Sequence, residues 1–266
     1  NWPKGPAIGA RSAILMEMNT HTILYAKNIH ERNYPASTTK ILTCLLAMQN
    51  CTMDEIVTFS YDSVHDVPTD GSKLGDVDEG DTLTMEQALY CVLVQSANEV
   101  ASAVGEHVAE KLSLMGENQK PIEAFADLMN QKAAELGCEG THFTNSNGLY
   151  DDNHYTTAYD LALIGCEFFN NELLCKMSST PQYHFRLNQT DEDERWMASK
   201  NQLYKGKPYE YSYLLGSKTG FVSQSRQTLV SAAEKNGMKL VCVVFYEETP
   251  YQFEDTIALF QYGFEN

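Results

Sequence analysis

Tyr213-Leu-Leu-Gly-Ser-Lys-Thr-Gly-Phe-Val222 is the first of three consecutive segments near the end of the chain that have the composition of β-strands. Residues 227–233 and 238–246 are the second and third. Between these two lies Asn236-Gly237, a pair that readily adopts the positive φ angles of a tight hairpin turn. The three segments therefore predict neighbouring antiparallel strands.

The beginning of the chain also has the composition of β-strands. Residues 12–18 and 22–26 are β-like and are separated by the turn-forming residues Asn19-Thr20-His21, which predicts a hairpin. From about residue 59 to residue 205, by contrast, apolar residues recur at helical spacing. Examples of this spacing are Met85, Leu89, Val92 and Leu93.

Strands at both ends of the chain and helices between them predict an α/β (α+β) fold. We expect one antiparallel sheet of about five strands, flanked by helices, with a mainly helical lobe inserted after the second strand. In this interpretation residues 1–266 form a single domain. Its α/β lobe comprises about residues 1–58 and 206–266, and its helical lobe about residues 59–205. A ligand site is expected in the cleft between the lobes.

The charge of the chain limits its partners. The 266 residues include 36 Asp and Glu against 19 Lys and Arg, for a formal net charge of −17. Nucleic acid is therefore an improbable partner, because a phosphate backbone needs a positive docking surface. The longest apolar runs, residues 41–48 and 240–245, fall well short of the roughly 20 residues that span a bilayer.

Seven cysteines are scattered along the chain without a Cys-x-x-Cys pair or a histidine pair at zinc spacing. Most lie inside apolar segments, so we expect them to pack as buried small hydrophobic residues, with at least one free thiol because their number is odd. We expect no metal and no cofactor. The chain begins Asn1-Trp-Pro-Lys4, without methionine, which suggests a processed or trimmed product whose leader has been removed.

Ser37-Thr-Thr-Lys40 and the apolar residues that follow predict a helix over residues 37–49 that starts near the serine, so the serine and the lysine are expected on one face of its first turn. The positive end of the helix and partial burial both disfavour an ammonium ion. A neutral Lys40 would then be able to take the proton of Ser37 and make it a nucleophile. Alone, this pattern is weak, because about one Ser-x-x-Lys is expected by chance in such a chain.

Two further motifs follow in order. Ser96-Ala-Asn98 comes after an apolar helical run, although Ser199-Lys-Asn201 matches the same short pattern, and the pattern alone does not choose between them. Lys218-Thr-Gly220 is more specific, since a given tripeptide is expected only about 0.05 times in a chain of this length. It lies on a predicted edge strand whose glycines leave the surface open to another backbone.

The ordered set of three motifs is the signature of active-site serine penicillin-recognising enzymes. Across nearly its whole length the sequence resembles the D-alanyl-D-alanine carboxypeptidases, which are low-molecular-mass penicillin-binding proteins. The resemblance also includes residues 34–40, 96–101, 144–149, 154–162, 216–221 and 262–264. It implies the penicillin-binding-protein or β-lactamase-like fold and a peptidoglycan stem peptide ending in D-Ala-D-Ala as substrate. It also implies β-lactams as covalent inhibitors.

The resemblance further implies the roles of individual residues. Ser37 would be the acylated nucleophile, Lys40 its general base, and Ser96 the residue that passes a proton to the leaving amine. The substrate-binding residues would be Asn98, Lys218, Thr219, Gly220 and Phe221, with backbone N–H groups of Ser37 and Phe221 forming the oxyanion hole. An extracytoplasmic location is expected, reached through a signal peptide, with any membrane contact made only by a segment outside this chain.

One position departs from the family pattern. Gln252 stands where relatives commonly have an arginine that binds the terminal carboxylate of D-alanine, so this recognition would rest on Lys218, Thr219 and Arg226. A DD-endopeptidase therefore remains an alternative, as do a serine amidase or esterase and a peptidoglycan-binding pseudoenzyme. A β-lactamase would need a Glu-x-x-Leu-Asn segment, but Thr144-Asn-Ser-Asn-Gly-Leu149 occupies the corresponding stretch. Residues 144–149 and 154–162 are expected to brace the helical lobe beneath the cleft, with His154 as a general base the less favoured alternative.

Overall fold

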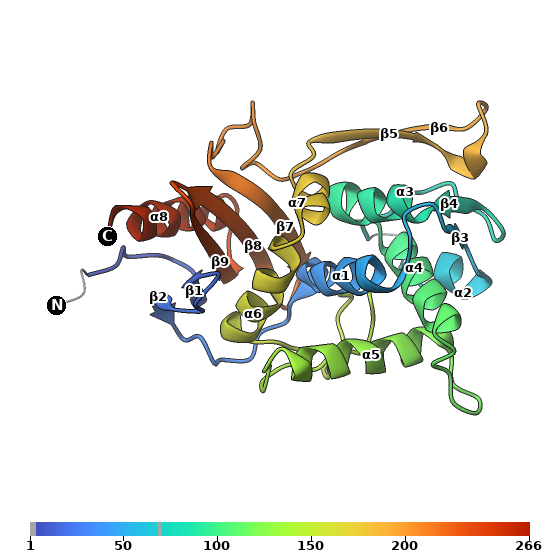
Figure 1. Cartoon of the computed structure of the whole chain (residues 1–266), viewed down its shortest axis with the longest axis horizontal. Coiled ribbons are helices and arrows are strands. Elements are labelled where there is room, and N and C mark those ends of the chain that lie inside the picture. Colours follow the sequence, from blue (N-terminus) through green and yellow to red (C-terminus); the bar gives the residue numbers. More distant parts are fainter. Residues whose placement is uncertain (1–3, 69–70) are drawn as a thin grey trace.

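A five-stranded antiparallel sheet lies in one half of the molecule, on the left in Figure 1. The computed structural model describes residues 4–68 and 71–266. The strand order is β2-β1-β9-β8-β7, so the two ends of the chain build one sheet, as predicted. Its strands are β1 (Ser12–Glu17), β2 (Ile23–Lys27), β7 (Leu214–Val222), β8 (Arg226–Lys235) and β9 (Met238–Glu247).

Both faces of this sheet are buried. Helix α8 (Tyr251–Glu265) covers one face and α6 (Ala158–Phe169) packs on the other (Figure 1). Successive side chains of a strand point to opposite faces, so β9 contributes alternately to two hydrophobic clusters. Leu240, Cys242 and Val244 lie in the cluster with α8, and Val241, Val243 and Phe245 lie in the larger cluster with α6. Burial on both sides explains the uninterrupted apolar run of this strand.

The remaining helical elements come from the middle of the chain, between β2 and β7. Helix α1 is central, because it packs against both α4 and α6. A 3₁₀ turn, η1 (Ala36–Thr39), precedes α1 and packs against β7 and β8 of the sheet. The other helical elements are α1 (Lys40–Asn50), α2 (Tyr61–His65), α3 (Met85–Tyr90), the π-helical turn η2 (Cys91–Gln95), α4 (Asn98–Lys111), α5 (Pro121–Glu135), α7 (Glu172–Ser178) and the 3₁₀ turn η3 (Leu187–Gln189).

Two small antiparallel sheets interrupt this helical region and were not predicted. One pairs β3 (Ile56–Thr58) with β4 (Thr82–Thr84), and the other pairs β5 (Gln182–Arg186) with β6 (Glu194–Ala198). In β5 and in β6 only one residue is buried, Phe185 and Met197 respectively. These strands are only three to five residues long, so each offers too few positions for a period-2 apolar pattern to stand out in the sequence.

All seven cysteines are free; four are buried and three are partly buried. Among residues 4–68 and 71–266, no helix combines the length and the apolar character that crossing a membrane requires.

Candidate active site

Ser37 and Lys40 lie where the helices meet the edge of the sheet. The sequence predicted a helix from residue 37, but Ser37 belongs to η1 and α1 begins at Lys40. A 3₁₀ turn stacks residues i and i+3 directly above one another. Lys40 Nζ accordingly lies 2.9 Å from Ser37 Oγ. The predicted Ser37–Lys40 pair is therefore present, although the local geometry that creates it is tighter than an α-helix.

Lys40 is completely buried, which is exceptional for a lysine. Besides Ser37, its amine contacts Asn98 Oδ1 at 2.7 Å and the carbonyl oxygen of Asn147 at 2.5 Å. Burial lowers the pKa of Lys40 well below its ordinary value, and the nearby charge of Lys218 lowers it further. A low pKa favours the neutral amine, whose lone pair is able to accept a proton from Ser37.

The Asn147 carbonyl is a site feature that the sequence analysis missed. Asn147 lies in the loop of residues 144–149, which is held beneath the site by hydrogen bonds to α1 and to α4. Thr43 of α1 donates to the Ser146 carbonyl at 2.6 Å, and Ser146 donates to the Ala101 carbonyl of α4 at 2.8 Å. Every residue has a backbone carbonyl, so no residue type identifies this one. The only signal is Asn147-Gly148 itself, a pair typical of tight turns.

Gly148 follows at φ +86° and approaches the backbone of η1 very closely. A Cβ at this position would lie 1.9 Å from the carbonyl oxygen of Ala36. Because backbone cannot swing aside like a flexible side chain, any residue other than glycine would push η1 and Ser37 out of place.

We therefore expect Gly148→Ala to destabilise the fold by about 1–3 kcal/mol through this overlap, in addition to the cost of its positive φ. Thermal unfolding of the purified protein measures the loss. Gly80→Ala is the matched control, because Gly80 also has a positive φ (+91°) but has open space around its Cβ position. An equal fall in melting temperature for the two variants would show that the contact with η1 is unimportant.

Ser96 lies opposite Ser37 and contacts Lys218. It follows η2 in the left-handed region, at φ +62°. Lys218 Nζ lies 2.9 Å from Ser96 Oγ and 2.8 Å from the carbonyl oxygen of Thr219. Lys218 is 2% exposed, and burial lowers its pKa to about 7. The motifs around Ser96 and Lys218, far apart in the sequence, therefore meet in one hydrogen-bonded pair.

The edge strand β7 carries Lys218-Thr219-Gly220 and lies against η1. A Cβ on Gly220 would be 3.0 Å from both the Pro35 carbonyl oxygen and the Ser37 backbone nitrogen. The prediction that the strand glycines permit close approach of another backbone is thus confirmed at Gly220. The contact brings the Ser37 backbone N–H next to the Gly220-Phe221 segment.

A cleft of about 620 Å³ opens over these residues. Its lining contains no Asp or Glu among the described residues, so the acidic excess of the chain lies elsewhere. Asn98, by contrast, is buried beside Lys40 and is not part of the described lining. The predicted site residues that line the cleft are Ser37, Ser96, Lys218, Thr219, Gly220 and Phe221.

Two glutamines of the cleft lining lie close together, and one of them, Gln227, is the cross-strand partner of Phe221. Gln252 and Gln227 both line the cleft, with Gln252 Nε2 3.5 Å from Gln227 Oε1. Arg226, considered from the sequence as a carboxylate ligand, forms an ion pair with Glu248 at 3.5 Å and is not among the described lining residues. Lys218 and Lys200 are the basic residues of the described lining.

Ser199 and His154 were the other candidates for catalytic residues in the sequence. Ser199 also lines the cleft, but its Oγ accepts a hydrogen bond from the Asn201 N–H, whereas Ser96 contacts Lys218. His154 is buried beneath η1, where its Nε2 lies 2.8 Å from Thr39 Oγ1 and its Nδ1 accepts from the Thr144 N–H. Burial lowers the pKa of His154 to about 3, so it is a neutral hydrogen-bonding brace.

Comparison with known proteins identifies the family. The crystal structure of the Streptomyces K15 DD-transpeptidase matches with a TM-score of 0.89 at 25% identity, covering 99% of this chain and 100% of that one. The fold is thus that of the DD-peptidases, as predicted. A family model described as D-alanyl-D-alanine carboxypeptidase matches residues 1–249. This chain belongs to that family.

Curated relatives are similar over most of this chain. D-alanyl-D-alanine carboxypeptidase DacF of Bacillus subtilis (strain 168) is 33% identical over 243 residues, covering 91% of this chain and 58% of that protein. The D-alanyl-D-alanine carboxypeptidase of Streptomyces sp. (strain K15) is 28% identical, with 97% of this chain and 88% of that protein covered. The chain thus spans somewhat less than two thirds of the length of the Bacillus relative.

Proposed function

We propose that this chain is the catalytic domain of a serine-type D-Ala-D-Ala carboxypeptidase. It trims peptidoglycan stem peptides through an acyl-enzyme on Ser37 and is acylated by β-lactams. The observation that carries the proposal is the fully buried Lys40 amine, 2.9 Å from Ser37 Oγ. Residues 1–266 act as one domain, with an α/β lobe of about residues 1–58 and 206–266 and a helical lobe of about residues 59–205.

Acylation begins with the Ser37 hydroxyl. Neutral Lys40 takes its proton, and Ser37 Oγ attacks the carbonyl carbon of the penultimate D-alanine. The negative charge that develops on the carbonyl oxygen is stabilised by the backbone N–H groups of Ser37 and Phe221. The close contact between Gly220 and η1 supports this step, because it brings those two backbone segments together.

Departure of D-alanine needs a proton on its nitrogen. Ser96 passes this proton on: its hydroxyl donates to the nitrogen and is reprotonated by the proton that Lys40 took from Ser37. The hydrogen bond between Ser96 and Lys218 holds the hydroxyl toward the cleft. Lys218 and the Thr219 hydroxyl bind the carboxylate end of the peptide. Water then attacks the Ser37 ester and releases the shortened stem peptide. The reaction requires no cofactor.

A second candidate, a DD-endopeptidase, is favoured by Gln252 and Gln227. These neutral amides line the cleft, and Gln252 stands at the position where relatives commonly have an arginine for the carboxylate of a leaving D-alanine. A glutamine hydrogen-bonds to a peptide group as well as to a carboxylate but provides no charge to favour the carboxylate. Cleavage of a D-alanyl bond inside a cross-link would then be possible on the same acyl-enzyme machinery.

The two candidates are separated by product analysis. With a peptide ending in D-Ala-D-Ala, the carboxypeptidase releases free D-alanine and leaves an internal cross-link intact, measured by mass spectrometry. Cleavage of the cross-linked peptide alone would establish the endopeptidase. Absence of any hydrolysis, despite binding of the peptide, would point to a pseudoenzyme and overturn both. Rapid turnover of benzylpenicillin without peptide hydrolysis would indicate a β-lactamase.

The proposed substrate determines the compartment in which the enzyme works. Peptidoglycan lies outside the cytoplasmic membrane, so the enzyme acts in an extracytoplasmic location after export by a signal peptide. The lining of the cleft, as far as residues 4–68 and 71–266 make it up, contains no Asp or Glu, which supports a peptide with a carboxylate end as ligand despite the overall net charge of −17.

A further inference from the structure

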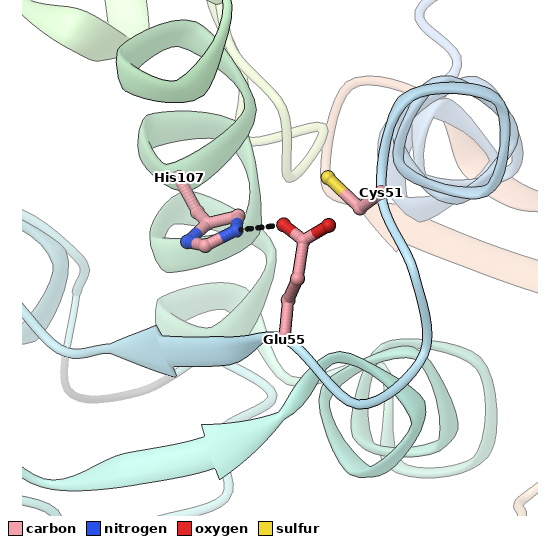
Figure 2. A group of neighbouring side chains, drawn as sticks. All are labelled: Cys51, Glu55 and His107. Carbon is pink, nitrogen blue, oxygen red and sulfur yellow. Dashed lines mark hydrogen bonds and ion pairs between the residues drawn. The ribbon is translucent and has the colours of Figure 1, made fainter.

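Three metal-ligating side chains meet at the end of the helical region away from the cleft. Cys51 follows the last residue of α1, Glu55 precedes β3, and His107 lies on α4 (Figure 2). Their ligand atoms all lie within 4.8 Å of one another. His107 Nε2 is 2.9 Å from Glu55 Oε2. We propose that Cys51, Glu55 and His107 form a binding site for a divalent transition-metal ion of the Zn²⁺ type.

The ligand set fits the chemistry of zinc. Zn²⁺ binds thiolate sulfur at about 2.3 Å and imidazole nitrogen or carboxylate oxygen at about 2.0–2.2 Å, usually with tetrahedral geometry. Ligand atoms around one such ion are therefore about 3.5 Å apart, and small side-chain rotations bring these three atoms to that spacing. The Glu55 and His107 side chains are 22% and 21% exposed, so an ion and a water as fourth ligand can reach them.

The charges at the site are compatible with the ion. A thiolate and a carboxylate together neutralise Zn²⁺, while the imidazole is a neutral ligand. Lys111 is the nearby cation, and it contacts Glu55 Oε1, as does the Thr52 N–H at 2.8 Å. These contacts orient the carboxylate and leave Oε2 facing His107.

Binding of the metal exchanges protons for the ion. A metal ion binds cysteine as the thiolate, so the S–H bond of Cys51 breaks as the sulfur–metal bond forms, and the proton passes to solvent. His107 donates its Nε2 proton to Glu55 in the metal-free site, so metal binding displaces that proton; the Nε2 lone pair then binds the ion and the neutral ring carries its proton on Nδ1. The hydrogen bond between His107 and Glu55 is replaced by bonds from both residues to the same ion.

The site is separate from the catalytic cleft but is connected to it through two helices. α1 begins at Lys40 and ends one residue before Cys51, a span of about 16 Å at 1.5 Å per residue. α4 begins at Asn98 and carries His107 in its last turns. A bound ion would link the C-terminal end of α1 to the C-terminal half of α4. The N-terminal residues of these two helices are Lys40 and Asn98. The expected effect is greater thermal stability.

The proposal is tested with Co²⁺ as a spectroscopic probe and Zn²⁺ as its competitor. Chelator-treated, full-length chain is expected to bind one equivalent of Co²⁺ with a sulfur-to-cobalt charge-transfer band. Zn²⁺ should abolish the band and raise the melting temperature. Cys51→Ser should remove the band, and His107→Gln should weaken binding by more than the roughly 10- to 100-fold that loss of an outer-shell partner costs.

Cys138→Ser is the matched control, because Cys138 is another partly buried cysteine remote in sequence from the site. It should keep the band and the Zn²⁺-induced rise in melting temperature. Absence of a charge-transfer band in the wild type, or an unchanged band in both Cys51→Ser and His107→Gln, would overturn the proposal. The readout does not involve peptidase activity, so it is independent of the proposed function.

Discussion

Replacing Ser37 by alanine is expected to abolish covalent labelling of the protein by a fluorescent penicillin. Ser37 Oγ is the nucleophile of the proposed reaction, and alanine has no atom that could form the ester. The hydroxyl lies beside the Lys40 amine and lines the cleft, so its removal eliminates the acceptor of the acyl group. Gel fluorescence and intact-protein mass spectrometry measure the loss, which should be complete.

Ser199→Ala is the control for this experiment. Ser199 lines the same cleft and belongs to the second Ser-x-Asn pattern, but it hydrogen-bonds to the Asn201 N–H. This variant should be labelled at a rate close to that of the wild type. Labelling that persists in Ser37→Ala and disappears in Ser199→Ala would reassign the nucleophile.

Lys40→Met is expected to slow acylation by about 10²- to 10⁴-fold, the usual contribution of a general base. Methionine has a similar unbranched shape but cannot take a proton. The substitution also leaves Asn98 Oδ1 and the Asn147 carbonyl without their buried donor, so some loss of stability should accompany it. Stopped-flow kinetics of penicillin binding, combined with a thermal melt of the same sample, separate the two effects.

Lys200→Met tests whether the effect is specific. Lys200 is a cationic residue of the cleft lining that makes no contact with Ser37 in the hydrogen bonds described above. Its replacement should change the acylation rate by less than a few-fold. An acylation rate in Lys40→Met within a few-fold of wild type, in a folded protein, would contradict the role of Lys40 as base.

The long strands, and their joining in one antiparallel sheet, were predictable because their apolar pattern and turn residues are strong. Residues 240–245 are apolar on both faces of β9, and Asn236-Gly237 marks the hairpin before it. The strands of the small sheets were missed because each buries a single side chain. The start of α1 was placed three residues early, since a 3₁₀ turn and the first turn of an α-helix share the same short-range residue preferences.

The candidate site was predictable to the extent that it consists of side chains. The three motifs named Ser37, Lys40, Ser96 and Lys218, which the structure brings together. The Asn147 carbonyl and the Gly148–Ala36 contact were not predictable, because backbone groups carry no residue-specific signal. Likewise, the cluster of Cys51, Glu55 and His107 has no recognisable metal spacing, because α4 supplies its third member from far along the chain.

The sequence by itself determined the family of this protein, the strand meander and the residue types that carry the chemistry. These depend on the local apolar pattern, the turn residues and the motifs, all of which can be recognised in the sequence alone. Only the tertiary structure decided which Ser-x-Asn serine contacts Lys218 and how deeply Lys40 is buried. It also decided that Cys51 and Glu55 lie next to His107. The physical reason is that burial, and the pKa shifts that follow from it, depend on neighbours supplied by distant segments.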